Sequence, residues 1–175
     1  CCHVATSYRI ILEFDKKTGT LRTTKHLKRL KLSFPPAVAK LIKNLYFHKK
    51  LEISEIGILS NLKNLRKVEW PALSKQIPER TFSGCGRLTE VILPEGLEDI
   101  NVEAFKNCCS IPQIQLPSTV KHILRGAFIN CSKLLDMELP ENLTVLDSEA
   151  FSFCRNLEKI NIPRTLSRIE SFCFF

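Results

Sequence analysis

A unit of 23 residues recurs through the second half of this 175-residue chain without insertion or deletion, and no other feature constrains the fold as strongly. Apolar residues and a Leu-Pro or Ile-Pro pair keep the same register in successive units. One turn of this length cannot bury its own apolar face, so the repeat predicts a solenoid in which each turn covers the next. The two clearest ladders are Phe82, Phe105, Phe128, Phe151 and Phe174, and Cys85, Cys108, Cys131 and Cys154.

Each unit contains a short segment whose side chains alternate between two faces. In one copy, we expect Val91 and Leu93 to point inward and Glu90 and Ile92 to point outward, as in a strand. The proline that follows has no N–H to donate, so it ends the strand. Side by side, these strands predict a parallel sheet, and the phenylalanines are expected to stack inside with ring centroids about 4.5 to 7 Å apart.

The unit has the form L-x-x-I-x-L-P-x-x-L-x-x-I-x-x-x-A-F-x-x-C-x-x, and it resembles the BspA-like subfamily of leucine-rich repeats from Leu65 to Phe175. Departures occur at Trp70-Pro71, Thr81 and Phe172-Cys173. The resemblance implies an α/β-type repeat solenoid, with short parallel strands on one face and loops or short helical turns on the other. It also implies a binding or adhesion role, because such proteins are commonly surface adhesins, while others belong to multidomain intracellular proteins. The family has no catalytic motif to carry over.

Three segments are expected along the chain. Residues 1–26 form an N-terminal cap or hairpin, 27–64 hold degenerate leucine-rich repeats, and 65–175 hold the regular repeats, truncated at the C-terminus because the chain stops before the next ladder cysteine. The hairpin prediction rests on strand-like residues 8–14 and 20–24 on either side of a turn. Residues 27–32 match the strand template.

The degenerate segment leaves one alternative open. Residues 36–45 have a proline start and helical spacing, yet a step of 23 back from Val68 and Trp70 favours a strand over residues 42–47. Residues 51–65 then resemble the helical back wall of an ordinary leucine-rich repeat.

The net charge of +8 is concentrated near the N-terminus. Residues 1–65 hold 13 Lys and Arg against 4 Asp and Glu, whereas the remainder holds 13 against 14. A basic leader of this kind could bind a polyanion, but it lacks the interleaved aromatic residues of a stacking platform, so nucleic acid is not the expected partner. The leader cations are Lys16, Lys17, Arg22, Lys25, Lys28, Arg29 and Lys31.

Catalytic and metal-binding patterns are not found in the sequence. Its four histidines are scattered, and it contains no H-E-x-x-H, C-x-x-C or glycine-rich phosphate motif. We therefore expect no enzyme activity, catalytic residue, metal or cofactor. The ladder cysteines are expected to be buried thiols and Trp70 a core residue. No apolar run is long enough to predict a membrane span.

The outward strand positions form a regular array that we predict as the ligand-binding face for an unidentified protein ligand. Alternatively, these side chains only keep the sheet soluble. The predicted function is recognition, of the adhesion or receptor type; the alternative is an intracellular scaffold segment of a larger regulatory protein. The resemblance favours the cell surface or secretion, whereas the oligomeric state is not predicted. The face comprises Lys67, Glu69, Glu90, Ile92, Gln113, Gln115, Asp136, Glu138, Lys159 and Asn161.

Overall fold

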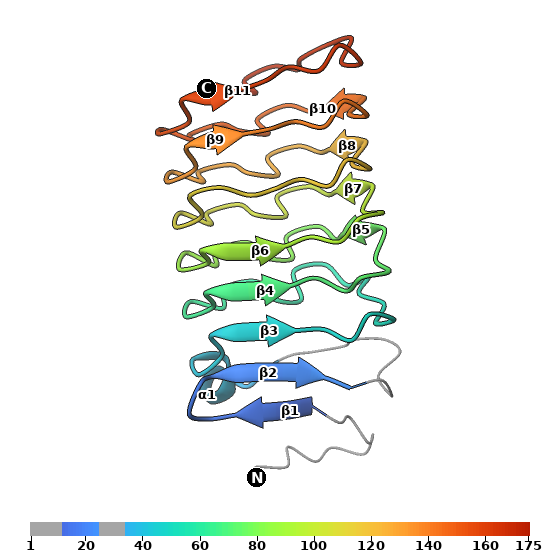
Figure 1. Cartoon of the computed structure of the whole chain (residues 1–175). Coiled ribbons are helices and arrows are strands. Elements are labelled where there is room, and N and C mark those ends of the chain that lie inside the picture. The colour runs from blue at the N-terminus through green and yellow to red at the C-terminus, as the bar shows by residue number, and fades with distance from the viewer. Residues whose placement is uncertain (1–11, 25–33) are drawn as a thin grey trace.

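The computed structural model describes residues 12–24 and 34–175, and these residues form a solenoid of stacked turns (Figure 1). The N-terminal hairpin lies at one end of the stack and the C-terminus at the other. Each turn brings three short walls of backbone around one continuous apolar core. The predicted class, an α/β-type repeat solenoid with short parallel strands on one face, is confirmed, and its helical content is low.

The front wall is a sheet whose strands recur once per turn. Its first two strands are antiparallel, and every later pair is parallel, with Asn44, Lys67 and Glu90 in register. A separate two-stranded parallel sheet continues the same wall higher in the stack. The five-stranded part consists of β1 (Leu12–Asp15), β2 (Thr20–Thr23), β3 (Asn44–Tyr46), β4 (Lys67–Glu69) and β6 (Glu90–Ile92), and the two-stranded part of β9 (Asp136–Met137) and β11 (Lys159–Ile160).

A second parallel sheet lies on another side of the stack (Figure 1). Its strands are only two residues long, and in each the second residue is buried while the first is exposed or half-buried. The inward residues Ile77, Ile100, Ile123 and Leu146 are all buried. These strands are β5 (Gln76–Ile77), β7 (Asp99–Ile100), β8 (His122–Ile123) and β10 (Val145–Leu146).

The third wall carries the phenylalanine ladder and joins successive turns through backbone hydrogen bonds. The N–H of Phe82 donates to the carbonyl of Ala104 at 2.8 Å, and that of Phe105 to Ala127 at 2.7 Å. Left-handed backbone recurs here every 23 residues, as at Asn107 (φ 60°) and Asn130 (φ 58°). Asparagine adopts this conformation more readily than most residues, so the local sequence fits the turn.

The core contains the predicted column of aromatic rings. Phe82, Phe105, Phe128 and Phe151 stack with centroids 5.2 Å apart, and Phe174 follows at 5.9 Å. Trp70, which is only 2% exposed, packs edge-on against Phe82 at 5.4 Å. Both the aromatic column and the core position of Trp70 are therefore confirmed, and the column fixes the register of the turns from the inside.

The ladder cysteines lie beside this column as thiols. The Sγ–H of Cys108 donates to the carbonyl of Phe82 at 3.2 Å, and that of Cys131 to Phe105 at 3.3 Å, so each thiol satisfies a carbonyl in the preceding turn. Cys154 repeats the contact with Phe128. The six cysteines within the described ranges are all free.

The N-terminal segment adds a hairpin and one turn of helix, α1 (Pro36–Ala39). Leu21 of the hairpin is buried, and Leu12 and Phe14 pack against the core. The strand favoured over residues 42–47 is confirmed by β3. The predictions for residues 8–11 and 27–32 lie outside the described residues.

The helical back wall predicted within residues 51–65 is wrong. Residues 56–61 form consecutive turns instead. Gly57 (φ 64°) and Asn61 (φ 59°) both adopt left-handed backbone, which interrupts a right-handed helix within a single turn.

Candidate binding face

The ten residues predicted from the sequence lie on the front wall in two parallel columns. Lys67 and Glu90 are register neighbours in the first column, as are Gln113 and Asp136, and then Asp136 and Lys159. The second column lies two residues further along each strand and contains Glu69, Ile92, Gln115, Glu138 and Asn161. Lys67 is half-buried and the other nine are exposed.

Three of these side chains are already engaged within the protein. Lys67 and Glu90 form an ion pair at 2.5 Å, and the bond to Glu90 raises the pKa of Lys67. The amide of Asn161 accepts from the N–H of Leu139 at 2.6 Å and donates to its carbonyl at 2.9 Å, so it replaces backbone pairing at the end of the sheet.

Three carboxylates on the face form no hydrogen bond or ion pair within residues 12–24 and 34–175. Glu69, Asp136 and Glu138 make no side-chain hydrogen bond or ion pair with any residue in the described part of the chain. Lys159 lies in register with Asp136, but no ion pair joins them. The upper part of the face therefore presents unpaired negative charge to solvent.

The front sheet is interrupted in the middle of this face, at Pro112. In the neighbouring turns, the residue at this position donates its N–H to the turn before, as Thr89 does to Arg66 at 2.9 Å and Leu135 to Pro112 at 3.0 Å. Pro112 has no N–H, so it cannot donate to Thr89. The described backbone shows no hydrogen bond between β6 and residues 113–116, and the front wall divides there into two sheets.

A shallow hollow of about 260 Å³ lies where the sheet is interrupted. Ile92, which is 42% exposed, contributes an apolar surface to it, and Gln115 and Glu95 contribute polar groups. Two residues of the predicted face, Ile92 and Gln115, thus meet at one site. The remaining lining residues are Val91, Leu93, Leu116 and Pro117.

The face also extends further toward the N-terminus than the sequence reasoning placed it. Asn44 and Tyr46 of β3 continue the two columns, and Arg22 of β2 lies next to Tyr46 in register. The Arg22 guanidinium lies 5.1 Å from the centre of the Tyr46 ring, which is a cation–π contact. Counting 23 back from Lys67 and Glu69 reaches Asn44 and Tyr46, so the repeat itself contained the signal.

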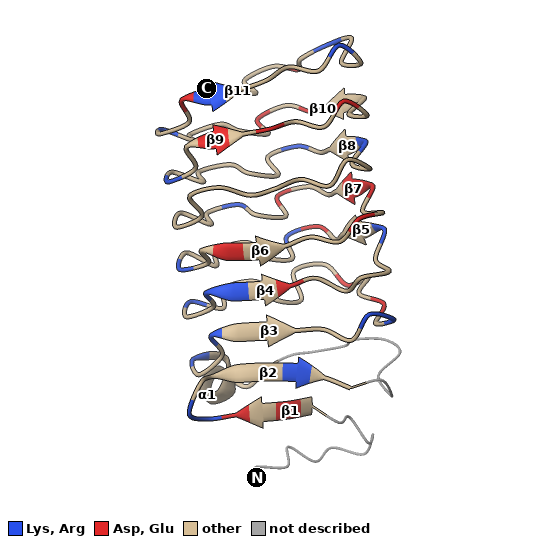
Figure 2. Ribbon diagram, viewed as in Figure 1, with Lys and Arg blue, Asp and Glu red and all other residues tan. Residues whose placement is uncertain are grey.

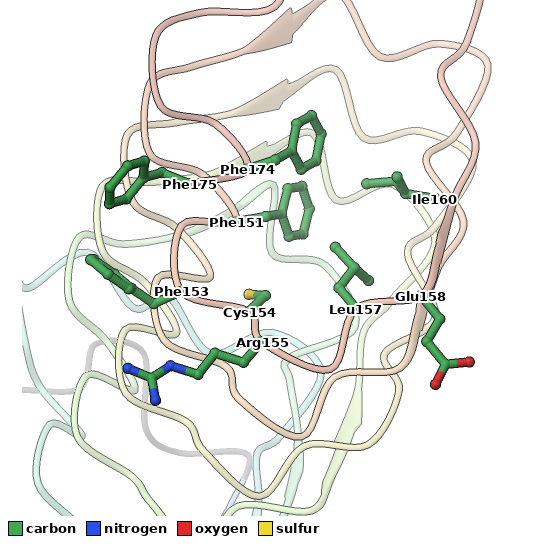
Figure 3. Close-up of a pocket in the computed structure, with 9 residues that line it drawn as sticks. All are labelled: Phe151, Phe153, Cys154, Arg155, Leu157, Glu158, Ile160, Phe174 and Phe175. Carbon is green, nitrogen blue, oxygen red and sulfur yellow. The ribbon is translucent and has the colours of Figure 1, made fainter.

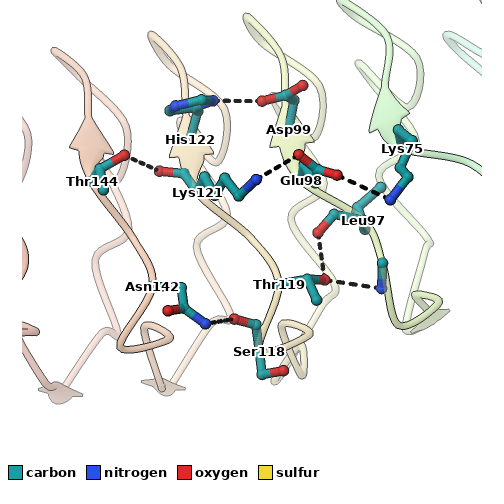
Figure 4. Close-up of polar contacts among 11 residues, drawn as sticks. Lys75, Leu97, Glu98, Asp99, Ser118, Thr119, Lys121, His122, Asn142 and Thr144 are labelled. Atoms are coloured by element: carbon teal, nitrogen blue, oxygen red, sulfur yellow. Dashed lines mark hydrogen bonds and ion pairs between the residues drawn. The ribbon is translucent and has the colours of Figure 1, made fainter.

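The second sheet differs because its charges neutralise one another (Figure 4). Glu98 bridges Lys75 at 3.0 Å and Lys121 at 2.8 Å, and the Nδ1 atom of His122 lies 2.6 Å from Asp99. The hydrogen bonds from Lys121 and Lys75 lower the pKa of Glu98 to about 2. The contribution of Glu98 to the stability of the folded state is therefore fully present above its unfolded pKa of about 4.3 and is lost as the pH falls toward 2.

A larger hollow of about 610 Å³ occurs at the last turn (Figure 3). Leu157, Ile160 and Phe174 line it, and each occupies a ladder position that is covered by the following turn in the inner repeats. Leu134 and Phe128, at equivalent inner positions, are fully buried. The hollow is thus the exposed end of the core, which explains its apolar lining, while Arg155 and Glu158 also line it.

Other predicted sites can be located only in part. Lys16 and Lys17 lie in the turn between β1 and β2, and Arg22 contacts Tyr46, whereas Lys25, Lys28, Arg29 and Lys31 lie outside the described residues. Within 12–24 and 34–175, no group of three His, Cys, Asp or Glu side chains could hold a metal ion. The same residues contain no helix with the length and apolar character needed to cross a bilayer.

Solved structures with the same fold come from bacteria. The chain is 20% identical to a leucine-rich repeat protein of T. pallidum, with a TM-score of 0.66. The matched region covers 92% of this chain and 82% of the T. pallidum chain. For a leucine-rich repeat protein of Bacteroides ovatus, the identity is 22% and the TM-score is 0.59, and the matched region covers 96% of this chain and 55% of that protein. For a leucine-rich cell surface protein of Faecalibacterium prausnitzii, the identity is 18% and the TM-score is 0.59, and the matched region covers 89% of this chain and 53% of that protein. This chain thus spans about half the length of the last two.

Sequence comparison identifies the family. No curated protein matches the chain significantly. The model of the BspA-type leucine-rich repeat region, however, matches residues 40–175 in six copies. This family is in general a non-enzymatic fold for protein interaction. The 23-residue ladders, the stacked parallel strands and this match together place the chain in the BspA-type leucine-rich repeat family.

Proposed function

We propose that the chain is a non-catalytic recognition module that binds a protein ligand through the front face. The observation that carries the proposal is the difference between the two sheets. The second sheet neutralises its charges internally, whereas Glu69, Asp136 and Glu138 on the front face have no partner in the described structure. Unpaired charges on a rigid array are available to an incoming surface at no cost in broken ion pairs.

The chemistry of the face indicates the kind of surface that would fit. Lysine or arginine side chains of a ligand would pair with Asp136, in β9, and with Glu138, which directly follows β9. Both side chains are exposed. An apolar side chain would contact Ile92 in the hollow beside Gln115. The proposed ligand is therefore a basic protein surface with at least one exposed apolar side chain.

We further propose an adhesion or receptor role for this module. The family match supports recognition, and one structure with the same fold is that of a cell surface protein. An intracellular scaffold segment is the second candidate, and the free thiols of the described cysteines favour it because disulfides are rare in reducing compartments.

The proposal can be tested with a library of natural protein fragments displayed on phage. Fragments selected on the wild-type chain would be measured against the triple variant Gln113→Lys, Asp136→Lys, Glu138→Lys. We expect the selected fragments to lose most of their affinity, about 2 to 5 kcal/mol if buried pairs are broken, because the variant replaces attraction by repulsion.

The matched control is Gln76→Lys, Glu141→Lys, Glu170→Lys, which changes the net charge by the same amount away from the front sheet. The fragments selected on wild type should bind this control variant with the same affinity as they bind wild type. If both variants bind equally well, the front face is not the binding site. If the selected fragments come from secreted or surface proteins, the adhesion or receptor role is favoured over the scaffold.

A further inference from the structure

A column of cations runs along the corner that precedes the front strands. Its members occupy three positions of the 23-residue repeat and all are exposed, but the turn that contains residues 107–112 contributes none. The six equivalent segments, residues 38–43, 61–66, 84–89, 107–112, 130–135 and 153–158, contain one acidic residue, Glu158. We call this column the basic edge. It consists of Lys40, Lys43, Lys63, Arg66, Arg87, Lys133 and Arg155.

Hydrogen bonds between turns align the densest part of the basic edge. The N–H of Arg66 donates to the carbonyl of Lys43 at 2.7 Å, and the side chain of Asn64 donates to the carbonyl of Lys40 at 2.8 Å. Arg87 reaches back one turn to Asn64 at 2.9 Å. Lys40 and Lys63, and likewise Lys43 and Arg66, thus lie one turn apart, at a backbone spacing of about 4.8 Å. Figure 2 shows blue segments recurring in the loops just before β4, β6, β9 and β11.

No carboxylate in the described structure pairs with the basic edge. Lys63 donates to the side chain of Asn61 and the carbonyl of Gly84, and Arg87 donates to Asn64, so both use neutral acceptors. Other cations of the solenoid, such as Lys75, Lys121 and Arg80, do pair with glutamates. Aligned like charges repel one another, and a bound anion would relieve that repulsion.

The arrangement favours one class of ligand. The cations of three consecutive turns lie along one corner of the solenoid, so they suit an extended polymer that carries anionic groups at intervals. Its segments contain no aromatic residue except Phe153, which packs edge-on against Phe175 at 5.7 Å, so there is no platform for stacking bases. Apart from the last turn, the exposed large apolar residues in the segments of the basic edge are Leu41 and Leu135, which lie four turns apart. These segments therefore form no continuous apolar strip that could insert into a membrane.

We propose that the basic edge binds a sulfated polysaccharide. Sulfate groups along the chain would accept charge-assisted hydrogen bonds from Lys40, Lys43, Lys63, Arg66 and Arg87 in three consecutive turns. This site is distinct from the protein-binding front face and uses the opposite charge. The module would thus bind a basic protein surface and an acidic glycan on adjoining walls.

The test uses the whole chain and fluorescent heparin oligosaccharides, with fully desulfated heparin as the chemical control. We expect wild type to bind the sulfated probe with an affinity that falls steeply as salt is raised, because bound counterions are released. The variant Lys63→Glu, Arg66→Glu should bind at least roughly tenfold more weakly near 0.15 M salt, with a salt slope lower by about 1 to 2.

The matched control is Lys49→Glu, Lys50→Glu, which changes the net charge equally at exposed lysines that follow β3 rather than precede it. Retained binding in this variant, with wild-type circular dichroism in both, supports the proposal. Equal weakening in the two variants would show a general charge effect and overturn it. So would absence of heparin binding at low salt, or tighter binding to oligothymidylate or to phosphatidylserine vesicles. None of these outcomes depends on whether the front face binds protein.

Discussion

At the scale of single residues, the ladder thiols show how burial controls chemistry. Burial raises the pKa of Cys85 to about 12 and that of Cys154 to about 11, and it raises those of Cys108 and Cys131 well above the usual range. The folded thiols therefore stay protonated at a pH where the unfolded chain ionises. Because the folded pKa is the higher one, stability is fully present below the unfolded value near 8.5 and declines as the pH rises above it.

The raised pKa of Cys108 predicts how stability changes with pH in the variant Cys108→Ser. Serine keeps a donor for the carbonyl of Phe82 but does not titrate in this range. Between pH 9 and pH 10 the variant should lose about 1 kcal/mol less unfolding free energy than wild type. Urea unfolding at several pH values measures the difference. Cys109→Ser, at a half-buried site off the ladder, is the control, and equal behaviour of the two variants would contradict the prediction.

Residue positions that repeat were predictable from the sequence, and their interactions were less so. The 23-residue interval alone identified the stacked phenylalanines, because identical inward positions in a stack must meet. The same interval places opposite charges side by side at Lys67 and Glu90 and at Asp136 and Lys159, yet only the first pair forms. Exposed lysine side chains have many rotamers, so register neighbours do not always pair.

At the scale of elements, the interruption of the front sheet depends on Pro112. The variant Pro112→Thr restores an N–H opposite the carbonyl of Thr89, and we expect this bond to rejoin the two front sheets. The net stability gain should be small, about 0 to 1 kcal/mol, because a hydrogen bond is worth about 0.5 to 1.5 kcal/mol and removing a proline loosens the unfolded chain. Hydrogen exchange should show protection of the new amide at position 112.

Thr89→Pro provides the reciprocal change at the same position one turn earlier. It removes the bond from Thr89 to Arg66 and should divide the sheet there, with a clear loss of stability. Rapid exchange of the amide in Pro112→Thr, at the rate of an unstructured peptide, would show that the interruption has another cause.

Elements outside the regular repeats were harder to predict. The strand over residues 42–47 followed from the interval, whereas the turns over residues 56–61 had apolar spacing that also fits a helix. Gly57 and Asn61 decide between the two because both take left-handed backbone, and neighbouring turns hold them through bonds such as Asn61 to Ser83 at 2.8 Å. Such contacts between turns are not visible in a local pattern.

At the scale of the whole molecule, the exposed end of the core should respond to an added turn. Appending a copy of the sequence Asn130–Ser152 after Phe175 continues the 23-residue register. The copy should cover Leu157, Ile160 and Phe174 and raise the melting temperature, by about 2 to 4 °C for each kcal/mol gained. Differential scanning calorimetry measures the change.

The control for this prediction is the same extension with serine at the positions that correspond to Leu134, Met137 and Phe151. This extension has the same length but lacks the three large apolar side chains that would cover Leu157, Ile160 and Phe174, so it should leave the melting temperature unchanged. Equal melting temperatures of the two extended chains would show that the last turn does not accept a stacked neighbour.

The overall architecture was the most predictable level, and the choice of surface was the least. Stacking follows directly from a repeat too short to fold alone. Which wall carries unpaired charge depends on individual contacts, such as the bridge of Glu98 between two lysines, that the repeat consensus does not contain. The basic edge and the interruption at Pro112 likewise arise from residues that differ between copies.

The interruption at Pro112 also has a mechanical consequence. When the ends of the stack are pulled apart, every junction between turns carries the same load, and each resists with the hydrogen bonds of the walls that are paired there. The junction above β6 keeps the pairing of β7 with β8 and the bonds of the third wall, but it has none in the front wall. Bending that opens the front wall between the described turns would therefore concentrate at that junction, on the side toward the hollow beside Ile92.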